Sequence, residues 1–358
     1  MVSRPGLTAL LGLLALAALL LAALLVVNWW HRRREARGAT LRRALHPMLI
    51  ARPVEPDPIP SAPLWMDDLS SADGRLALVT CLEALPGLDP AAADRVRVLL
   101  RRSRAARREL DRLGHRSAAR RIEACRFAGR LGDAGAVPRL VQLLQDRDRA
   151  VRREAIRALG ELRAVDAVPD IAGAIETMEE WGNLLLVMAL IRMGPACAPA
   201  IGALLAAPGA RSQATIKGLL QVTSRIGVAA DPGAIRSLAA HEDLEIRVEA
   251  VRVLGAIEPD PRSGDVCLAA MDDAEWPVRA IAAASLGRLQ DERALPRLAR
   301  AMGDPAYWVR HHVAEAMASM GEPGAEALRR ALRDANPFVR DMAAQVLFMR
   351  ALADGEAA

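Results

Sequence analysis

The sequence is poor in aromatic residues and almost without lysine. Phe, Trp and Tyr make up 3% of the 358 residues, whereas apolar residues reach 52%, and Lys217 is the only lysine. Leu and Ala supply most of the apolar content, and both favour α-helices. A large single-core β or α/β enzyme needs more aromatic bulk than this. The composition therefore predicts many thin helical layers, whose ends are marked by the 22 Pro and 25 Gly.

Catalytic and metal-binding motifs are also missing. Gly-x-Ser-x-Gly, P-loop and G-x-G-x-x-G patterns are absent. The adjacent His311 and His312 point about 100° apart on a helix and cannot hold one ion together, and His311 with Glu315 supplies only two ligands. No C-x-x-C pair exists among the cysteines, which are Cys81, Cys125, Cys197 and Cys267. Such isolated cysteines are typical of buried apolar positions in a reducing compartment. We expect no enzyme, no metal and no cofactor.

One long apolar run stands at the start of the chain. Residues 7–27 carry no charge, and as a helix they would span about 31 Å, enough to cross a bilayer. Trp29 and Trp30 follow, as expected at a membrane interface, and three arginines come next: Arg32, Arg33 and Arg34. No A-x-A-like site ends the run, which favours a retained anchor over a cleaved signal peptide. The excess of arginine after the run predicts that the long C-terminal part is cytoplasmic.

A repeat of about 31 residues fills the C-terminal two thirds. Val-Arg pairs at 278/279, 309/310 and 339/340 are spaced by 31 and 30 residues, and Ile246-Arg247 lies 32 residues earlier. Val151-Arg152 lies 95 residues before that, close to three further periods. Each repeat predicts a short first helix and a second helix that starts at an Asp-rich turn. We expect Asp273, Asp304 and Asp334 to cap second helices, and Gly160, Gly255 and Gly287 to mark where the chain turns back.

The capping acid, the Val-Arg pair, the mid-helix Ala and the Leu-Gly and Leu-Pro-x-Leu sequences resemble HEAT repeats of the short, bacterial, lyase-like class. The resemblance covers residues 119 to about 350. It implies an all-α fold, a right-handed α-solenoid, here preceded by one transmembrane helix. It also implies that Arg and Asp of successive repeats interlock, which gives a structural role to Arg152, Arg247, Arg279, Arg310 and Arg340.

Five regions are predicted in total. They are a transmembrane anchor (1–30), a juxtamembrane linker rich in Arg and Pro (31–63), a helical capping region (64–118), the repeat solenoid (119–350) and a disordered tail (351–358). The capping region is expected because the first repeat of a solenoid otherwise exposes an apolar face.

Aromatic residues recur at one position of the repeats. Each stands two or three residues before the Arg of a repeat or its degenerate equivalent: Trp181, Trp276, Tyr307, Trp308 and Phe338. We call this set the aromatic rim. Because Trp and Tyr are enriched at interface hot spots, the rim is a candidate partner-binding edge. Packing between neighbouring repeats is the alternative interpretation.

Basic charge is concentrated before the repeats. Residues 95–130 hold 13 Arg and three acids, among them Arg101, Arg102, Arg104, Arg107 and Arg108. Three interpretations stay open: a solvated helix face, contact with anionic lipid headgroups in which Arg32, Arg33 and Arg34 would share, and nucleic-acid binding. No compact nucleic-acid recognition motif is present, which counts against the last.

The whole layout resembles bacterial membrane-anchored HEAT proteins that accompany glycosyltransferases making surface polysaccharide. That resemblance implies a single-pass protein of the bacterial plasma (inner) membrane, with a cytoplasmic solenoid acting as scaffold or adaptor for a membrane-embedded protein partner. Two alternatives are a nucleic-acid-binding HEAT protein and, least favoured, a lyase-type HEAT enzyme or its accessory subunit. A HEAT-type diiron hydroxylase is excluded because the chain has one His-Glu pair, His241-Glu242.

Overall fold

A computed structural model describes residues 71–87, 89–178, 182–227, 231–257 and 261–356. Every regular element within these ranges is a helix, and none is a strand, so the all-α prediction is confirmed there. The chain divides into two compact units, Met1–Asp133 and Ala134–Ala358. We call them unit 1 and unit 2.

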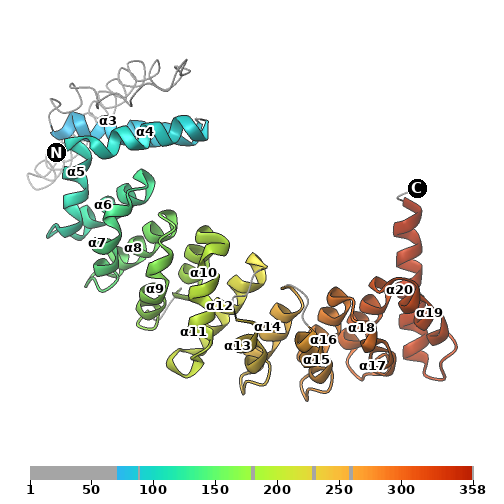
Figure 1. The fold of residues 1–358 in the computed structure, drawn as a ribbon. Helices are drawn as coiled ribbons and strands as arrows, with labels where there is room; N and C mark the ends of the chain where they lie inside the picture. The colour runs from blue at the N-terminus through green and yellow to red at the C-terminus, as the bar shows by residue number, and fades with distance from the viewer. Residues whose placement is uncertain (1–70, 88, 179–181, 228–230, 258–260, 357–358) are drawn as a thin grey trace, which may run out of the picture. The chain divides into compact units, whose positions relative to one another are not determined.

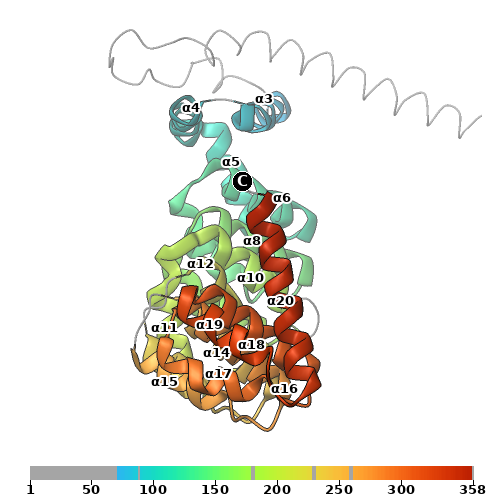
Figure 2. The same cartoon turned by 90° about the vertical axis from the view of Figure 1, so that its right-hand side faces the viewer.

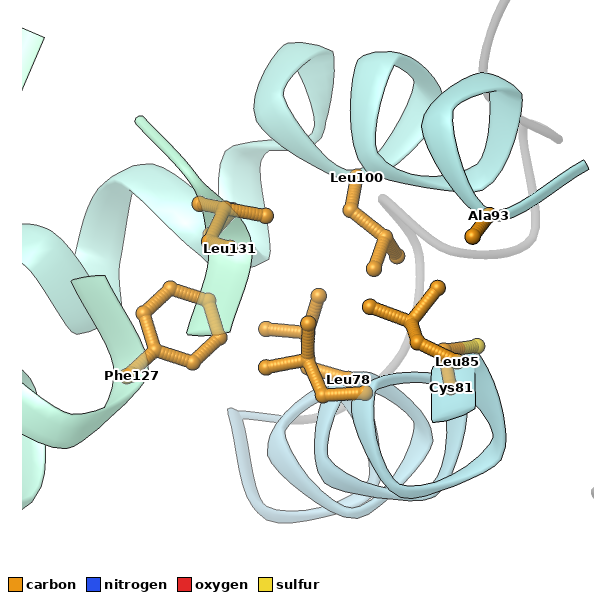
Figure 3. Close-up of a cluster of buried hydrophobic side chains, with 9 residues drawn as sticks. Leu78, Cys81, Leu85, Ala93, Leu100, Phe127 and Leu131 are labelled. Carbon is orange, nitrogen blue, oxygen red and sulfur yellow. The ribbon is translucent and has the colours of Figure 1, made fainter. Parts of the chain in front are cut away.

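The described part of unit 1 is a small helical cluster. Its helices are α3 (Ser71–Ala84), α4 (Pro90–Arg102), α5 (Arg104–Asp111) and α6 (Ala118–Leu131), with 3-10 turns η1 (Leu85–Gly87) and η2 (Arg112–Gly114). Leu78 of α3, Leu100 of α4 and Phe127 and Leu131 of α6 point into one shared core (Figure 3). Burial of each such side chain contributes about 1.5–3 kcal/mol. The predicted boundary at 118/119 falls at the start of α6, whereas the compact unit continues to Asp133.

Unit 2 consists of helix pairs that follow one another along the chain (Figure 1). The first helices are α7 (Val137–Leu143), α9 (Val168–Ile175), α11 (Ala198–Leu205), α13 (Pro232–Leu238), α15 (Pro261–Ala270), α17 (Leu295–Ala301) and α19 (Gly321–Ala331). The second helices are α8 (Arg149–Glu161), α10 (Gly182–Met193), α12 (Gln213–Ile226), α14 (Leu244–Leu254), α16 (Trp276–Leu289), α18 (Tyr307–Ser319) and α20 (Pro337–Glu356). Short 3-10 turns precede several of them: η3 (Ala134–Ala136), η4 (Val165–Ala167), η5 (Gly194–Cys197), η6 (Pro208–Ala210) and η7 (Glu292–Ala294).

Each second helix packs against the second helices of its two neighbours, in the order α8, α10, α12, α14, α16, α18 and α20. At the C-terminal end, α20 lies against α18 and α19 (Figure 2). Its last turns continue through residues 351–356, where the sequence predicted a tail. The handedness of the array stays a prediction.

Two of the three glycines late in the second helices serve packing rather than turning. Gly160 and Gly287 lie inside α8 and α16 without a left-handed backbone conformation, contrary to the expectation that the chain turns back there. Gly255 is the residue at which α14 ends, as expected. A Cβ on Gly287 would lie 2.8 Å from the Cα of Ala316 in the next second helix. The turn itself comes three residues later in two of the repeats, at the left-handed residues Arg163 (φ 51°) and Gln290 (φ 54°).

The Asp residues before the second helices organise the turn rather than the helix. Asp273 accepts a hydrogen bond from the backbone N–H of Glu275 at 2.9 Å, and Asp304 accepts one from Ala306 at 2.8 Å. Glu275 and Ala306 are themselves the residues at the N-caps of α16 and α18, and neither provides a side-chain cap. The expected capping role is therefore wrong for these two acids. Each closes a two-residue Asx turn in front of its helix.

One stretch of the described residues, Gly182–Leu205, is long and apolar enough to cross a membrane, with a mean hydropathy of 1.9. In the structure it comprises α10, η5 and α11 rather than one continuous helix. Leu186 and Leu190 of α10 are fully buried in the helix stack. The buried side of this stretch is therefore part of the protein core. The predicted anchor and linker, residues 1–63, lie outside the described residues.

All four cysteines are free and buried. Burial raises the pKa of the Cys81 thiol to about 11 and, with Asp291 nearby, that of Cys267 to about 12. The thiolate is the reactive form, so we expect no labelling by iodoacetamide near pH 8 in the folded protein and complete labelling in urea. Mass spectrometry of the labelled protein measures this. Rapid modification of Cys81 or Cys267 without denaturant would contradict it.

Candidate functional site

The described members of the aromatic rim are all exposed and stand at the starts of neighbouring second helices. Trp276 begins α16, Tyr307 and Trp308 begin α18, and Phe338 is the second residue of α20. Their exposed fractions are 45%, 45%, 53% and 61%. Because α16 packs on α18 and α18 on α20, the structure brings these four residues to consecutive positions of one edge. Trp181 lies outside the described residues.

Two histidines support the rings on α18. The Tyr307 ring stacks on His311 with centroids 6.0 Å apart, and the Trp308 ring stacks on His312 at 6.3 Å. Both histidines reach Glu315, at 3.3 Å each. The stacked rings leave Tyr307 and Trp308 ordered and half-exposed, which suits aromatic anchors of a protein interface. The histidines were not linked to the rim from the sequence, although each stands four residues after its aromatic partner, a spacing that places both side chains on one face of the helix.

No group of three or more His, Cys, Asp or Glu side chains in the described ranges could hold a metal ion. Glu315 is an acceptor shared by two histidines rather than part of such a group. The chemistry that the rim offers is thus aromatic contact and hydrogen bonding.

Below the rim, arginines and aspartates of successive repeats interlock. The Nε of Arg247 donates to Asp273 at 2.9 Å, and the Nε of Arg279 donates to Asp304 at 2.8 Å. The Nη1 of Arg279 also donates to the carbonyl oxygens of Asp273 and Ala274, both at 2.9 Å. Hydrogen bonding to Asp304 raises the pKa of Arg279 above its usual value. We call Arg247, Asp273, Arg279 and Asp304 the arginine ladder. It confirms the interlocking that the resemblance implied for these two arginines.

The ladder changes at Arg310. Its Nη1 donates to the carbonyl oxygen of Asp304 at 2.7 Å, but its buried Nε has no partner. The guanidinium instead lies over the Phe338 ring, 5.0 Å from the centroid, and 5.9 Å from that of Tyr307. Cation–π contact thus replaces the carboxylate contact found one repeat earlier. Arg310 is a positioning residue for two members of the rim.

The other two arginines of the Val-Arg pairs, Arg152 and Arg340, donate hydrogen bonds to backbone carbonyl oxygens of the turn before their own helix. Arg152 donates to Asp146 at 2.9 Å, and Arg340 donates to Asp334 and Ala335 at 2.8 Å each. Both tie the start of a second helix to the turn before it. These contacts are structural, but they lie within one repeat and do not show the interlocking with the next repeat that the resemblance implied.

The predicted basic residues of unit 1 are exposed. This holds for Arg101, Arg102, Arg104, Arg107 and Arg108 of α4 and α5. Arg101 donates to the carbonyl oxygen of Leu131 at 3.4 Å. A buried acid on the opposite side of α5, Glu109, is held by Arg112 at 2.6 Å and by Arg75 at 3.7 Å. Arg75, Arg101 and Arg112 therefore serve the fold of unit 1, while the side chains listed last are exposed at its surface: Arg102, Arg104, Arg107 and Arg108. Arg32, Arg33 and Arg34 lie outside the described residues.

The helix pairs, the ladder and the turn geometry agree with a comparison to protein families. A family model described as HEAT repeats matches residues 106–191 and 264–348. These two segments are HEAT repeats. The stretch between them, residues 192–263, is not matched, yet α11 to α14 form the same helix pairs.

Several solved structures are similar at low identity. Human deoxyhypusine hydroxylase in complex with glycerol is 20% identical, with 89% of this chain and 96% of that chain covered and a TM-score of 0.30. YibA of Escherichia coli is 15% identical, with 74% of this chain and 94% of that chain covered and a TM-score of 0.41. Kap95p in the complex with RanGDP is 14% identical, with 87% of this chain and 52% of that chain covered and a TM-score of 0.49. Identities and TM-scores this low relate none of these proteins' activities to this chain. No curated protein matches the sequence.

Proposed function

We propose that this chain is a scaffold that binds a protein partner through the aromatic rim and has no catalytic activity of its own. The observation that carries the proposal is the row of four exposed aromatic side chains on α16, α18 and α20. Aromatic residues are scarce in this sequence, so their concentration on one edge has a specific use. Exposed Trp and Tyr supply most of the binding energy in many protein interfaces.

The finer proposal is that the scaffold is a right-handed solenoid tethered to the bacterial plasma membrane by residues 7–27, with the repeats in the cytoplasm. Two molecules anchored in one bilayer have a high effective concentration, so a modest interface suffices for binding. The partner in this proposal is a membrane-embedded protein, and the resemblance stated for the sequence suggests a polysaccharide-making glycosyltransferase. The exposed arginines of α4 and α5 would contact anionic headgroups.

The rim is tested by Trp308→Ala in the full chain. We expect the yield of the crosslinked partner in native membranes to fall roughly tenfold, because a hot-spot aromatic contributes about 2 kcal/mol or more. Thermal unfolding should stay unchanged, since the Trp308 side chain is half-exposed. Phe348→Ala is the matched control, because Phe348 is 65% exposed but lies ten residues, or about 15 Å, along α20 from Phe338. Equal yields from both variants would refute the rim as the binding edge.

A further inference from the structure

A second apolar surface lies on α10. Leu184, Met188 and Ile191 are exposed by 49%, 45% and 37%, while Leu186 and Leu190 on the opposite side are fully buried. The spacing of four and three residues places the exposed three in a straight line of about 10 Å along the helix. We call them the apolar stripe. None of the three is needed to fill the core of the repeat, which the buried face already does.

The neighbouring helices carry polar side chains at the positions that correspond to Leu184 and Met188. The left-handed residues Arg163, Gly194 and Gly227 end α8, α10 and α12 at equivalent points. Counted back by equal steps from those points, Leu184 corresponds to Arg153 on α8 and Lys217 on α12, and Met188 to Arg157 and Gln221. The α10 repeat therefore differs from both neighbours in having an apolar solvent-facing side. Exposed apolar runs of this kind lower solubility unless they have a use.

The three helices are held close together, with α10 between α8 and α12 (Figure 1). A Cβ on Gly160 of α8 would lie 2.9 Å from the Cα of Ala189, and one on Gly218 of α12 would overlap Asn183. At Gly160 only glycine lets the backbones of α8 and α10 approach this far, and at Gly218 only glycine leaves room for the Asn183 side chain. The side chains on α8 and α12 therefore form the two borders of the apolar stripe.

Both borders carry unneutralised positive charge. Among the described residues, Arg153 on α8 and Arg225 on α12 are exposed and make no ion pair. Two acids of these helices and of α14 are paired with other cations: Glu161 of α8 pairs with Arg192 at 3.1 Å, and Glu245 of α14 pairs with Lys217. A ligand that covers the apolar stripe would thus meet a free guanidinium on either side.

We propose that α10 docks an amphipathic helix of the protein partner, with apolar side chains on the stripe and acidic side chains facing Arg153 and Arg225. This inference rests on the proposed function, because it takes the partner to be a protein. Apolar anchors spaced by three and four residues are the recognition mode of a helix laid in a groove. The acidic side chains of the bound helix, paired with Arg153 and Arg225, would set its register and orientation.

A lipid surface fits the stripe less well. The described rim residues Trp276, Tyr307, Trp308 and Phe338 are on other helices, so the stripe itself contains no aromatic side chain suited to the interface of a bilayer. Its three apolar residues come from one helix and are bordered on both sides by helices with polar surfaces. If the stripe inserted into a bilayer, the polar side chains of α8 and α12 would have to enter the headgroup region together with it.

The test places a photoreactive benzoylphenylalanine at position 184 of the full chain in its native membranes, with a second variant carrying it at position 308 in the rim. Mass spectrometry identifies the crosslinked segment. We expect the position-184 product to be a helical segment with apolar residues at three- and four-residue spacing and flanking acids. Met188→Glu should lower its yield about tenfold, whereas Phe348→Glu, which places the same charge at an exposed apolar position of α20, should leave most of it.

The outcomes separate the two proposals. Crosslinks at position 308 but none at 184 would leave the rim in place and overturn the docking of a helix on α10. Absence of both would overturn the proposed function as well. Products at 184 that consist of lipid, or of a segment without flanking acids, would also contradict the helix proposal. Because Leu184 and Met188 are half-exposed, neither variant should change the thermal unfolding midpoint.

Discussion

Replacing Asp304 by alanine is expected to lower the free energy of unfolding by about 3 kcal/mol. Asp304 accepts from Arg279 Nε at 2.8 Å and from Nη2 at 3.1 Å, and it also accepts from the Ala306 N–H. The side chains of Asp304 and Arg279 are only 10% and 16% exposed. Asp304→Ala therefore leaves a mostly buried guanidinium without its carboxylate and an open turn before α18. Urea unfolding followed by circular dichroism measures the loss.

Two controls separate the buried pair from a general charge effect. Asp265 pairs with Arg293 at 3.0 Å, but both side chains are more than half exposed, so Asp265→Ala should cost about 0.5 kcal/mol or less. The double variant Asp304→Ala with Arg279→Met should be more stable than Asp304→Ala alone, because no charge is then left without a partner. If Asp304→Ala and Asp265→Ala were equally stable, the ladder would not join the repeats energetically.

Gly287→Ala should lower the free energy of unfolding by about 1–3 kcal/mol, although alanine is the better helix former. Gly287 lies in α16, and the added methyl group would meet the Cα and Cβ of Ala316 at 2.8 Å each. Both atoms belong to α18, so α16 and α18 would have to separate. The strain outweighs the gain of about 1 kcal/mol in helix propensity.

Gly173→Ala is the matched control for Gly287→Ala. Gly173 also lies within a helix, α9, but a Cβ there meets no atom within 4 Å. Alanine should therefore stabilise the protein by up to about 1 kcal/mol at this position. The two variants make the same chemical change with opposite expected signs. A gain in stability from both would show that the close approach of α16 and α18 is not required.

The sequence predicted the helices of unit 2 well because their signals are local. The Val-Arg spacing located the second helices α14, α16, α18 and α20, since each pair lies in the first turns of one of them. Contacts between residues of different repeats were harder to predict from the sequence. Gly287 was expected to turn the chain, since a glycine near a helix end usually does, and nothing local indicates that Ala316 lies against it.

For the candidate sites, too, local signals were predicted from the sequence and contacts between repeats were not. Spacing identified the aromatic rim, and the structure places its four described members in the exposed positions that a binding edge requires. The apolar stripe escaped detection because Leu184 and Met188 look like core residues in an apolar helix. Only the lateral alignment of α8, α10 and α12 shows that their neighbours at the same level are Arg153 and Lys217. That alignment depends on how far each helix is rotated about its axis, which periodicity alone leaves open.

The stacking of one helix pair on the next fixes the distance between the two candidate binding surfaces of unit 2. Adjacent second helices pack at about 8–10 Å, so the apolar stripe on α10 and the rings on α18, four steps apart, are separated by about 30–40 Å along the array. A partner that engages both must present its two binding segments at that separation. Loss or gain of one repeat between α10 and α18 would change the distance between the two surfaces by one helix-to-helix spacing. The number of repeats therefore helps to determine which partner can bind both surfaces.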